Sequence, residues 1–248
     1  MNFIKRHFNN KFFKQKGPSA FKKAYEAISK SKVYEQYCQR VHGQETKMLN
    51  TMALDQYQLL VERINELSPK TMLDLGCGNG ELTKQISKEL SIKSIGIDFS
   101  FMGKDVKGTQ FKQIDTEHFK LEKKFDLILS VDSFYMIKNY KDFLKNLLLH
   151  LNPNGKVIIL ITILDEALED HRLMSACKKL NLKVDKYDLT KSDRNFWISS
   201  KKVLEEMNQV FVDEDQFYLW GIKKKEADKN IALHDSNSSN RYLLELSI

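Results

Sequence analysis

The chain has 248 residues, 42% of them hydrophobic, which suffices for one large domain with a sizeable core. Its net charge of +7 comes from residues 1–33, which hold nine basic residues and one acidic residue. The remainder holds 31 basic and 32 acidic residues. A body without a positive excess is not built to neutralise many phosphates, which argues against nucleic acid as a partner. Three widely spaced cysteines predict free thiols in a reducing, cytoplasmic compartment, and no apolar run reaches the roughly 18 residues that span a bilayer.

Residues 1–18 are predicted to form a basic arm. Ile4, Phe8 and Phe12 fall on one helical face among lysines, and Gly17-Pro18 breaks the segment. We expect a solvated, poorly ordered extension; the alternative is a helix that makes weak contact with a membrane surface or binds a partner.

Residues 19–67 have the periodicity of helices up to Pro69, and a larger domain follows over residues 68–248. From residue 71 onward, strand-like and helical segments alternate. Alternation of this kind predicts an α/β fold with a mostly parallel sheet covered by helices on both faces. We expect strands at 71–75, 93–98, 109–113, 126–131 and 157–163, and further strand-like runs at 216–223 and 241–247.

The most informative stretch is Leu73-Asp74-Leu75-Gly76-Cys77-Gly78-Asn79-Gly80, in which alternating glycines follow an apolar run and precede a helical pattern. A strand, a glycine turn and a helix N-terminus together make a pocket for a ligand with polar or negative groups. Asp98 ends the second strand, where its carboxylate can accept both hydroxyls of a ribose. Asp115 would end the third strand, where it could face an adenine amine.

The spacing G-x-G-x-G differs from the G-x-G-x-x-G of nicotinamide-binding folds. With Asp74 before it and Asp98 after it, the chain resembles the class I S-adenosylmethionine-dependent methyltransferases over residues 71–164. The resemblance implies a Rossmann-like seven-stranded sheet of order 3-2-1-4-5-7-6, with the last strand antiparallel, helices on both faces and an N-terminal helical lid. It implies S-adenosylmethionine as cofactor, held by Asp74, Gly76, Cys77, Gly78, Gly80, Asp98, Phe99, Asp115, Thr116 and Ser130.

One departure from the family pattern concerns the adenine side. Only 16 residues separate Asp98 from Asp115, and Gly103 and Gly108 lie among them. We expect a short helix there, with an adenine pocket that is shallower or has a rebuilt wall.

The segment after the fourth strand, Ser130-Val131-Asp132-Ser133-Phe134-Tyr135-Met136-Ile137, should carry the contacts to the methyl acceptor. It lacks the Pro-Pro motif of enzymes that methylate exocyclic amines of nucleobases, and it resembles the small-molecule branch of the family. We predict Asp132 and Tyr135 as catalytic residues: Asp132 could orient an amine or take a proton from a hydroxyl, and Tyr135 could line the methyl path. The alternative is that Asp132 caps a turn and Tyr135 packs in the core.

Enzymes of this branch cover the site with N-terminal helices and with an insertion after the fifth strand. Residues 19–67 and about 165–198 fit those two places. The candidate residues for contacting the substrate or closing the lid are Tyr25, Tyr34, Tyr37, Gln56, Phe134, His171 and Trp197.

The sequence therefore predicts a cytoplasmic methyltransferase, monomeric or homodimeric, that acts on a nitrogen or oxygen of a small-molecule acceptor. No cluster of His, Cys and Asp has metal-ligand spacing, so we expect no metal. One alternative is an RNA or protein methyltransferase that recruits its substrate through the basic arm. The other is a cofactor-binding scaffold that has lost catalysis.

Overall fold

A seven-stranded sheet forms the centre of the molecule, with the strand order β3-β2-β1-β4-β5-β7-β6. The computed structural model describes residues 17–43, 47–49, 52–100 and 103–248, so the arm expected at 1–18 lies almost wholly outside it. β7 pairs antiparallel with both β5 and β6, and the other pairs are parallel, which confirms the expected topology. The strands are β1 (Thr71–Leu75), β2 (Lys93–Asp98), β3 (Thr109–Gln113), β4 (Phe125–Val131), β5 (Leu151–Leu164), β6 (Lys183–Asp188) and β7 (Ser239–Ser247).

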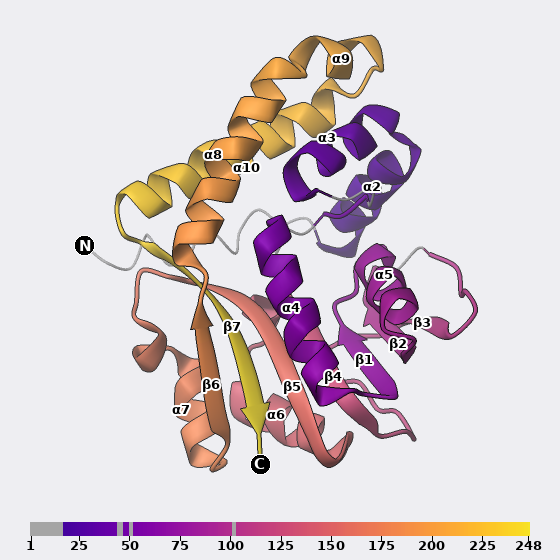
Figure 1. Ribbon diagram of the computed structural model, residues 1–248, viewed down its shortest axis with the longest axis vertical. Helices are drawn as coiled ribbons and strands as arrows, with labels where there is room; N and C mark the ends of the chain where they lie inside the picture. The colour runs from indigo at the N-terminus through magenta and orange to yellow at the C-terminus, as the bar shows by residue number, and fades with distance from the viewer. Residues whose placement is uncertain (1–16, 44–46, 50–51, 101–102) are drawn as a thin grey trace.

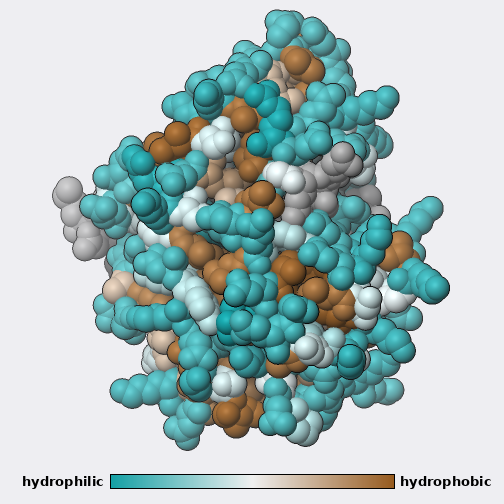
Figure 2. Space-filling view, in the orientation of Figure 1, coloured by the Kyte–Doolittle hydropathy of each residue, from teal (hydrophilic) through white to brown (hydrophobic). Residues whose placement is uncertain are grey.

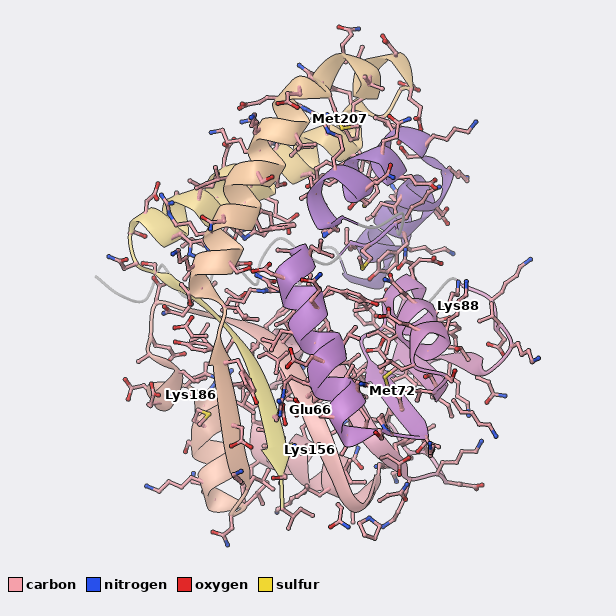
Figure 3. All side chains as sticks on the ribbon, in the orientation of Figure 1. Glu66, Met72, Lys88, Lys156, Lys186 and Met207 are labelled. Atoms are coloured by element: carbon pink, nitrogen blue, oxygen red, sulfur yellow. The ribbon has the colours of Figure 1, made fainter. Side chains whose placement is uncertain are left out.

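Helices cover both faces of the sheet, because successive side chains along a strand point to opposite sides. Met72 and Leu129 face one side, where they pack with α4 and α5 (Figures 1 and 3). Leu73 and Ile128 face the other side, where they pack with α6 and α7. These helices are α4 (Leu54–Leu67), α5 (Glu81–Glu89), α6 (Tyr140–Leu149) and α7 (Arg172–Lys179).

A helical lid stands over the carboxyl ends of the parallel strands (Figure 1). It joins segments far apart in the sequence, and its own core contains Tyr34, Tyr37, Leu204 and Phe211. Glu214 links the C-terminal lid helices to the N-terminal ones. Its carboxylate accepts the backbone N–H groups at the start of α3, at 2.7 and 2.5 Å. The lid helices are α2 (Gly17–Lys30), α3 (Lys32–His42), α8 (Thr190–Glu206), α9 (Asn208–Asp213) and α10 (Phe217–Asp235).

The structure corrects three sequence-based boundaries. The run 216–223 is not a strand but lies mostly in α10, where Leu219 and Trp220 pack into the lid core. Residues 165–198 are not an insertion, since they supply α7 and the edge strand β6; the inserted helices span 190–235. Of the expected lid 19–67, α4 instead covers the sheet, where Leu60 and Ile64 are fully buried.

The surface is largely hydrophilic. Figure 2 shows hydrophobic residues gathered across the middle of one face, around α4, with mostly hydrophilic residues toward the edges. None of the helices in the described part of the chain combines the length and hydrophobicity that crossing a bilayer requires.

A buried histidine makes the lid sensitive to acid. Burial lowers the pKa of His42 from 6.5 to about 4, and its Nδ1 lies 2.6 Å from the Met52 carbonyl oxygen. Between about pH 6.5 and pH 4 the unfolded chain binds a proton at this residue while the folded chain does not, so the folded state loses stability as the pH falls. Between pH 7 and pH 5 the wild type should lose about 2 kcal/mol of unfolding free energy that His42→Gln does not lose.

Urea unfolding at the two pH values measures this difference. The exposed His118, changed to Gln, is the control and should leave the wild-type pH dependence intact. Equal pH dependence in the wild type and His42→Gln would contradict the assignment.

Candidate functional site

The glycine turn after β1 has a backbone that other residues adopt at a cost. Gly76, Gly78 and Gly80 have φ values of 74°, 59° and 79°, in the left-handed region. A Cβ on Gly76 would lie 2.4 Å from the Cβ of Ser133, so no side chain fits there. The Gly76 N–H donates to the Ile97 carbonyl at 2.8 Å, which fixes the turn against the end of β2. The turn is therefore held in a fixed position at the carboxyl edge of the sheet.

Asp98 lies directly across from this turn, at the end of β2. One carboxylate oxygen accepts the Gly78 N–H at 3.1 Å, and the other accepts the Ser100 N–H at 2.7 Å. Burial raises the pKa of Asp98, and the two backbone hydrogen bonds oppose that shift. The half-buried Phe99 follows it. A carboxylate has lone pairs for further donors, so Asp98 keeps the capacity to accept hydroxyl groups beside the glycine turn.

Three of the expected cofactor contacts support the turn from behind. Asp74 is 2% exposed and accepts a hydrogen bond from the Thr83 hydroxyl at 2.5 Å, which anchors α5; burial raises its pKa to about 7. The Cys77 sulfur fills the space beside Gly96, where a Cβ would meet it at 2.9 Å. The buried Ser130 shares a short hydrogen bond with Ser133. The structure thus gives Asp74, Cys77 and Ser130 structural contacts.

The short helix expected between β2 and β3 is absent from the described part of that connection. The described residues 103–108 contain no helix. β3 ends at Gln113, two residues before Asp115. Asp115 is exposed and accepts the Glu117 N–H at 3.0 Å, and Thr116 beside it is half-buried. Neither Asp115 nor Thr116 makes a hydrogen bond to the glycine turn in the described part of the chain.

Asp132 follows β4 and does not cap a turn. It has a φ of 53°, and its carboxylate makes two parallel contacts with the guanidinium of Arg241, at 2.9 and 3.0 Å. Tyr135 follows on the short helix η2 (Phe134–Met136) and is 40% exposed, so it is not a core residue. The alternative of a turn cap and a core aromatic is therefore excluded for this pair.

Arg241 is a residue of the site that the sequence reasoning missed. Besides Asp132, its guanidinium donates to Thr162 at 2.9 Å and to Gln56 at 3.2 Å, and it lies 3.4 Å from Asp193. Gln56, a lid candidate, is thus a fully buried partner of Arg241. The available signal was a charged residue two positions before the apolar pair Leu243-Leu244 of a strand-like run.

Tyr25 of α2 closes over the glycine turn. Its hydroxyl lies 3.0 Å from the position that a Cβ on Gly78 would take, and its ring is 7% exposed. Burial, and next the charge of Asp98, raise the pKa of Tyr25 far above its ordinary value. Of the lid candidates, Tyr25 is the one that lies against the glycine turn.

The remaining lid candidates have packing or capping roles. The hydroxyl of Tyr34 donates to the Met48 carbonyl at 2.8 Å, and that of Tyr37 shares a hydrogen bond with Ser200 at 2.6 Å, both inside the lid core. A large aromatic side chain in a lid can either pack in the lid core or face the ligand. Both roles give the same sequence pattern, so the sequence could not distinguish them. Phe134 packs against Phe143, Trp197 donates to Asp193, and His171 caps α7 by accepting the Leu173 N–H.

Comparisons with known proteins give the family. The family model described as a methyltransferase domain matches residues 50–207. Malonyl-[acyl-carrier protein] O-methyltransferases of Bacillus cereus and Calditerrivibrio nitroreducens are 33% and 31% identical over 112 and 108 residues, or 42% and 39% of this chain. In each case the match spans 42% of the relative, which is less than half of its length.

Solved structures share the fold. Phosphoethanolamine N-methyltransferase 2 of Haemonchus contortus, in complex with S-adenosyl-L-methionine, matches with a TM-score of 0.69 and 15% identity, over 86% of this chain and 55% of that one. A cyclopropane synthase of Mycobacterium tuberculosis matches with a TM-score of 0.66 and 12% identity, over 90% and 98%. The glycine turn, the strand order and the family model agree, and the chain belongs to the class I S-adenosylmethionine-dependent methyltransferases.

Proposed function

We propose that this protein transfers the methyl group of S-adenosylmethionine to a nitrogen or oxygen of a small-molecule acceptor. The observation that carries the proposal is the contact between the glycine turn and the segment after β4. Ser133, between Asp132 and Tyr135, lies against Gly76, and its hydroxyl donates to the Leu75 carbonyl at 2.7 Å. Groups that would meet an acceptor therefore lie beside groups that would hold the methyl donor.

Methyl transfer is an in-line displacement in which the acceptor lone pair forms the new bond and the carbon–sulfur bond breaks. Catalysis can come largely from holding the three reacting atoms in line. In this proposal Asp132 orients the acceptor and takes its proton, Tyr135 lines the path, and Tyr25 with the lid keeps water out. The bound cofactor supplies the electrophilic methyl group.

Two of the solved neighbours are named as N-methyltransferases. Besides the phosphoethanolamine enzyme, a coclaurine N-methyltransferase matches with a TM-score of 0.55 and 15% identity. Because identity this low shows the fold alone, the acceptor is taken from the residues around Asp132 and not from these names.

A second candidate acceptor is an acyl group on a carrier protein. It is favoured by three curated relatives that are malonyl-[acyl-carrier protein] O-methyltransferases, at 27–33% identity. A malonyl group presents a carboxylate oxygen, which is a different nucleophile from an amine or a hydroxyl.

Release of S-adenosylhomocysteine from the purified protein tests the proposal. The acceptor panel should hold small amines, hydroxyl compounds, free carboxylic acids, malonyl-carrier protein, RNA and protein. We expect turnover with small amines or hydroxyl compounds. Turnover with malonyl-carrier protein alone would select the second candidate, turnover with RNA or protein alone would reject a small acceptor, and cofactor binding without turnover on any of them would indicate a scaffold.

Changing Asp132 to Asn should separate the acceptor role from cofactor binding. We expect turnover to fall about 100-fold, because a positioned general base contributes 10²–10⁴, while the cofactor dissociation constant stays within about threefold. Asp126→Asn is the matched control at the other end of β4, where Asp126 accepts the Thr71 N–H at 2.9 Å. It should lower stability and leave turnover intact. Equal losses of turnover and cofactor binding in Asp132→Asn would place Asp132 outside the acceptor site.

A further inference from the structure

Arg241 is buried at the junction of the sheet and the lid. Its side chain is 1% exposed and has partners on four separate segments. Two lie on the sheet side, namely Asp132 after β4 and Thr162 on β5, and two come from helices, namely Gln56 on α4 and Asp193 on α8. Asp193 is itself held by His234 of α10, at 2.9 Å.

A guanidinium does not lose its proton in a protein, so its burial costs several kcal/mol unless its donors are paired. The paired, parallel contacts with Asp132 fix both the position and the plane of that carboxylate. Asp132 is thereby held in a left-handed backbone conformation, which Asp tolerates better than most residues. Its side chain remains 23% exposed although Arg241 is not, so one side of the carboxylate is free for another donor.

A second ion pair likewise joins a buried cation to a partly exposed carboxylate. The side chain of Lys223 is 5% exposed and lies 2.9 Å from Glu226, whose side chain is 34% exposed. Glu226 is near enough to Asp132 and Tyr135 to raise the pKa of both. An acceptor that approaches Asp132 is therefore within the negative field of two carboxylates, which favours a group that donates hydrogen bonds and repels another carboxylate.

We propose that Arg241 is a positioning residue that holds the Asp132 carboxylate toward the methyl acceptor, and that the acceptor is an amine or a hydroxyl, which brings a proton, and not a carboxylate. Because Asp132 faces an acceptor only if the proposed function holds, the acceptor class rests on that function. When the acceptor attacks the methyl carbon, its proton passes to Asp132 and sulfur keeps the electron pair of the broken bond. Arg241 stays charged throughout.

The proposal has a consequence for pH. Asp132 is faced by Arg241 from β7, Asp193 from α8, Glu226 from α10 and Tyr135 from η2. Burial raises the pKa of Asp132, whereas Arg241 lowers it by charge and by hydrogen bonds. Removing Arg241 leaves only influences that raise this pKa. Since an ionised Asp132 is needed, the acid limb of the rate profile should move to higher pH.

Arg241→Met and Arg241→Lys test the positioning role, because Met removes the charge and Lys keeps it without the paired contacts. We expect turnover to fall at least 100-fold in Arg241→Met and about tenfold in Arg241→Lys, with cofactor affinity within threefold of wild type. The acid limb should rise by more than one pH unit in Arg241→Met and by less in Arg241→Lys. Arg63→Met is the matched control, since it breaks another ion pair of β7, to Glu245 at 2.5 Å, and leaves Glu245 its contact with Lys156. It should lower stability without moving the acid limb.

A carboxyl NMR titration of the protein without ligand measures the pKa of Asp132 directly, with Asp132→Asn assigning the signal. This titration needs no turnover, so the positioning role can be judged even if the proposed function fails. Failure of the proposed function would appear separately, as the absence of S-adenosylhomocysteine release by the wild type. If Arg241→Met does not fold, Arg241→Lys decides. An unchanged Asp132 pKa and a rate within threefold of wild type in a folded Arg241 variant would overturn the positioning role. Turnover with carboxylates alone would overturn the acceptor class and leave the methyltransferase function standing.

Discussion

Replacing Gly76 with alanine should lower the affinity for S-adenosylmethionine more than tenfold and the free energy of unfolding by about 2–4 kcal/mol. Part of this cost is the left-handed backbone, since Gly76 has a φ of 74°. The larger part is steric, because the new Cβ would lie 2.4 Å from the Cβ of Ser133. Either the turn or the segment after β4 must move, and both belong to the candidate site.

Gly108 provides a matched control for the backbone term. It also has a positive φ, 85°, but a Cβ there would meet nothing within 4 Å. Gly108→Ala should therefore cost about 1–2 kcal/mol and leave cofactor affinity unchanged. Urea unfolding and calorimetry measure the two quantities. Adding Ser133→Gly to Gly76→Ala should recover part of the loss, and a Gly76→Ala variant no worse than Gly108→Ala would show that the contact with Ser133 is not rigid.

The sheet was predictable from the sequence up to β5, because the signals there are local. β1 and β4 are rich in apolar residues, and β1, β2 and β3 begin and end at the expected residues. Beyond β5 the local signals mislead. Phe217 to Gly221 has the aromatic composition of a strand, yet the lid core makes it helical, whereas β6 is a polar edge strand with Lys183, Asp185 and Lys186.

The cofactor half and the acceptor half of the candidate site differed in how far the sequence predicted them, and the reason is again whether the signal is local. A glycine turn reports its own backbone requirement, so the cofactor half could be read from a few adjacent residues. The acceptor half depends on pairs that only the folded topology brings together: Arg241 lies 109 positions from Asp132 and 185 from Gln56. Sequence could name Asp132 as a candidate but not the guanidinium that contacts it. It could not tell a tyrosine beside the glycine turn, such as Tyr25, from one packed inside the lid core, such as Tyr37.

Asp98→Ala should weaken S-adenosylmethionine binding by tenfold to a few hundredfold. A charged acceptor of ribose hydroxyls contributes about 1.5–3 kcal/mol, and a tenfold change corresponds to 1.4 kcal/mol. The loss should exceed that of one contact, because Asp98 also accepts the N–H groups of Gly78 and Ser100, at 3.1 and 2.7 Å. Removing the carboxylate therefore takes away the hydrogen bond that holds the glycine turn as well as the acceptor for the ribose hydroxyls. Calorimetric titration of S-adenosylhomocysteine and S-adenosylmethionine measures the change.

Two further variants separate these contributions. Asp98→Asn keeps one oxygen for a backbone donor and a neutral acceptor for the ribose, so it should bind the cofactor better than Asp98→Ala but worse than wild type. Asp115→Ala removes an exposed carboxylate, which accepts the Glu117 N–H at 3.0 Å, and it should cost less than threefold. If Asp115→Ala weakened binding as much as Asp98→Ala, the cofactor would lie nearer to β3 than the turn implies. Unchanged affinity in Asp98→Ala would remove the ribose contact from this site, because no buried carboxylate so near the ribose could be lost without effect.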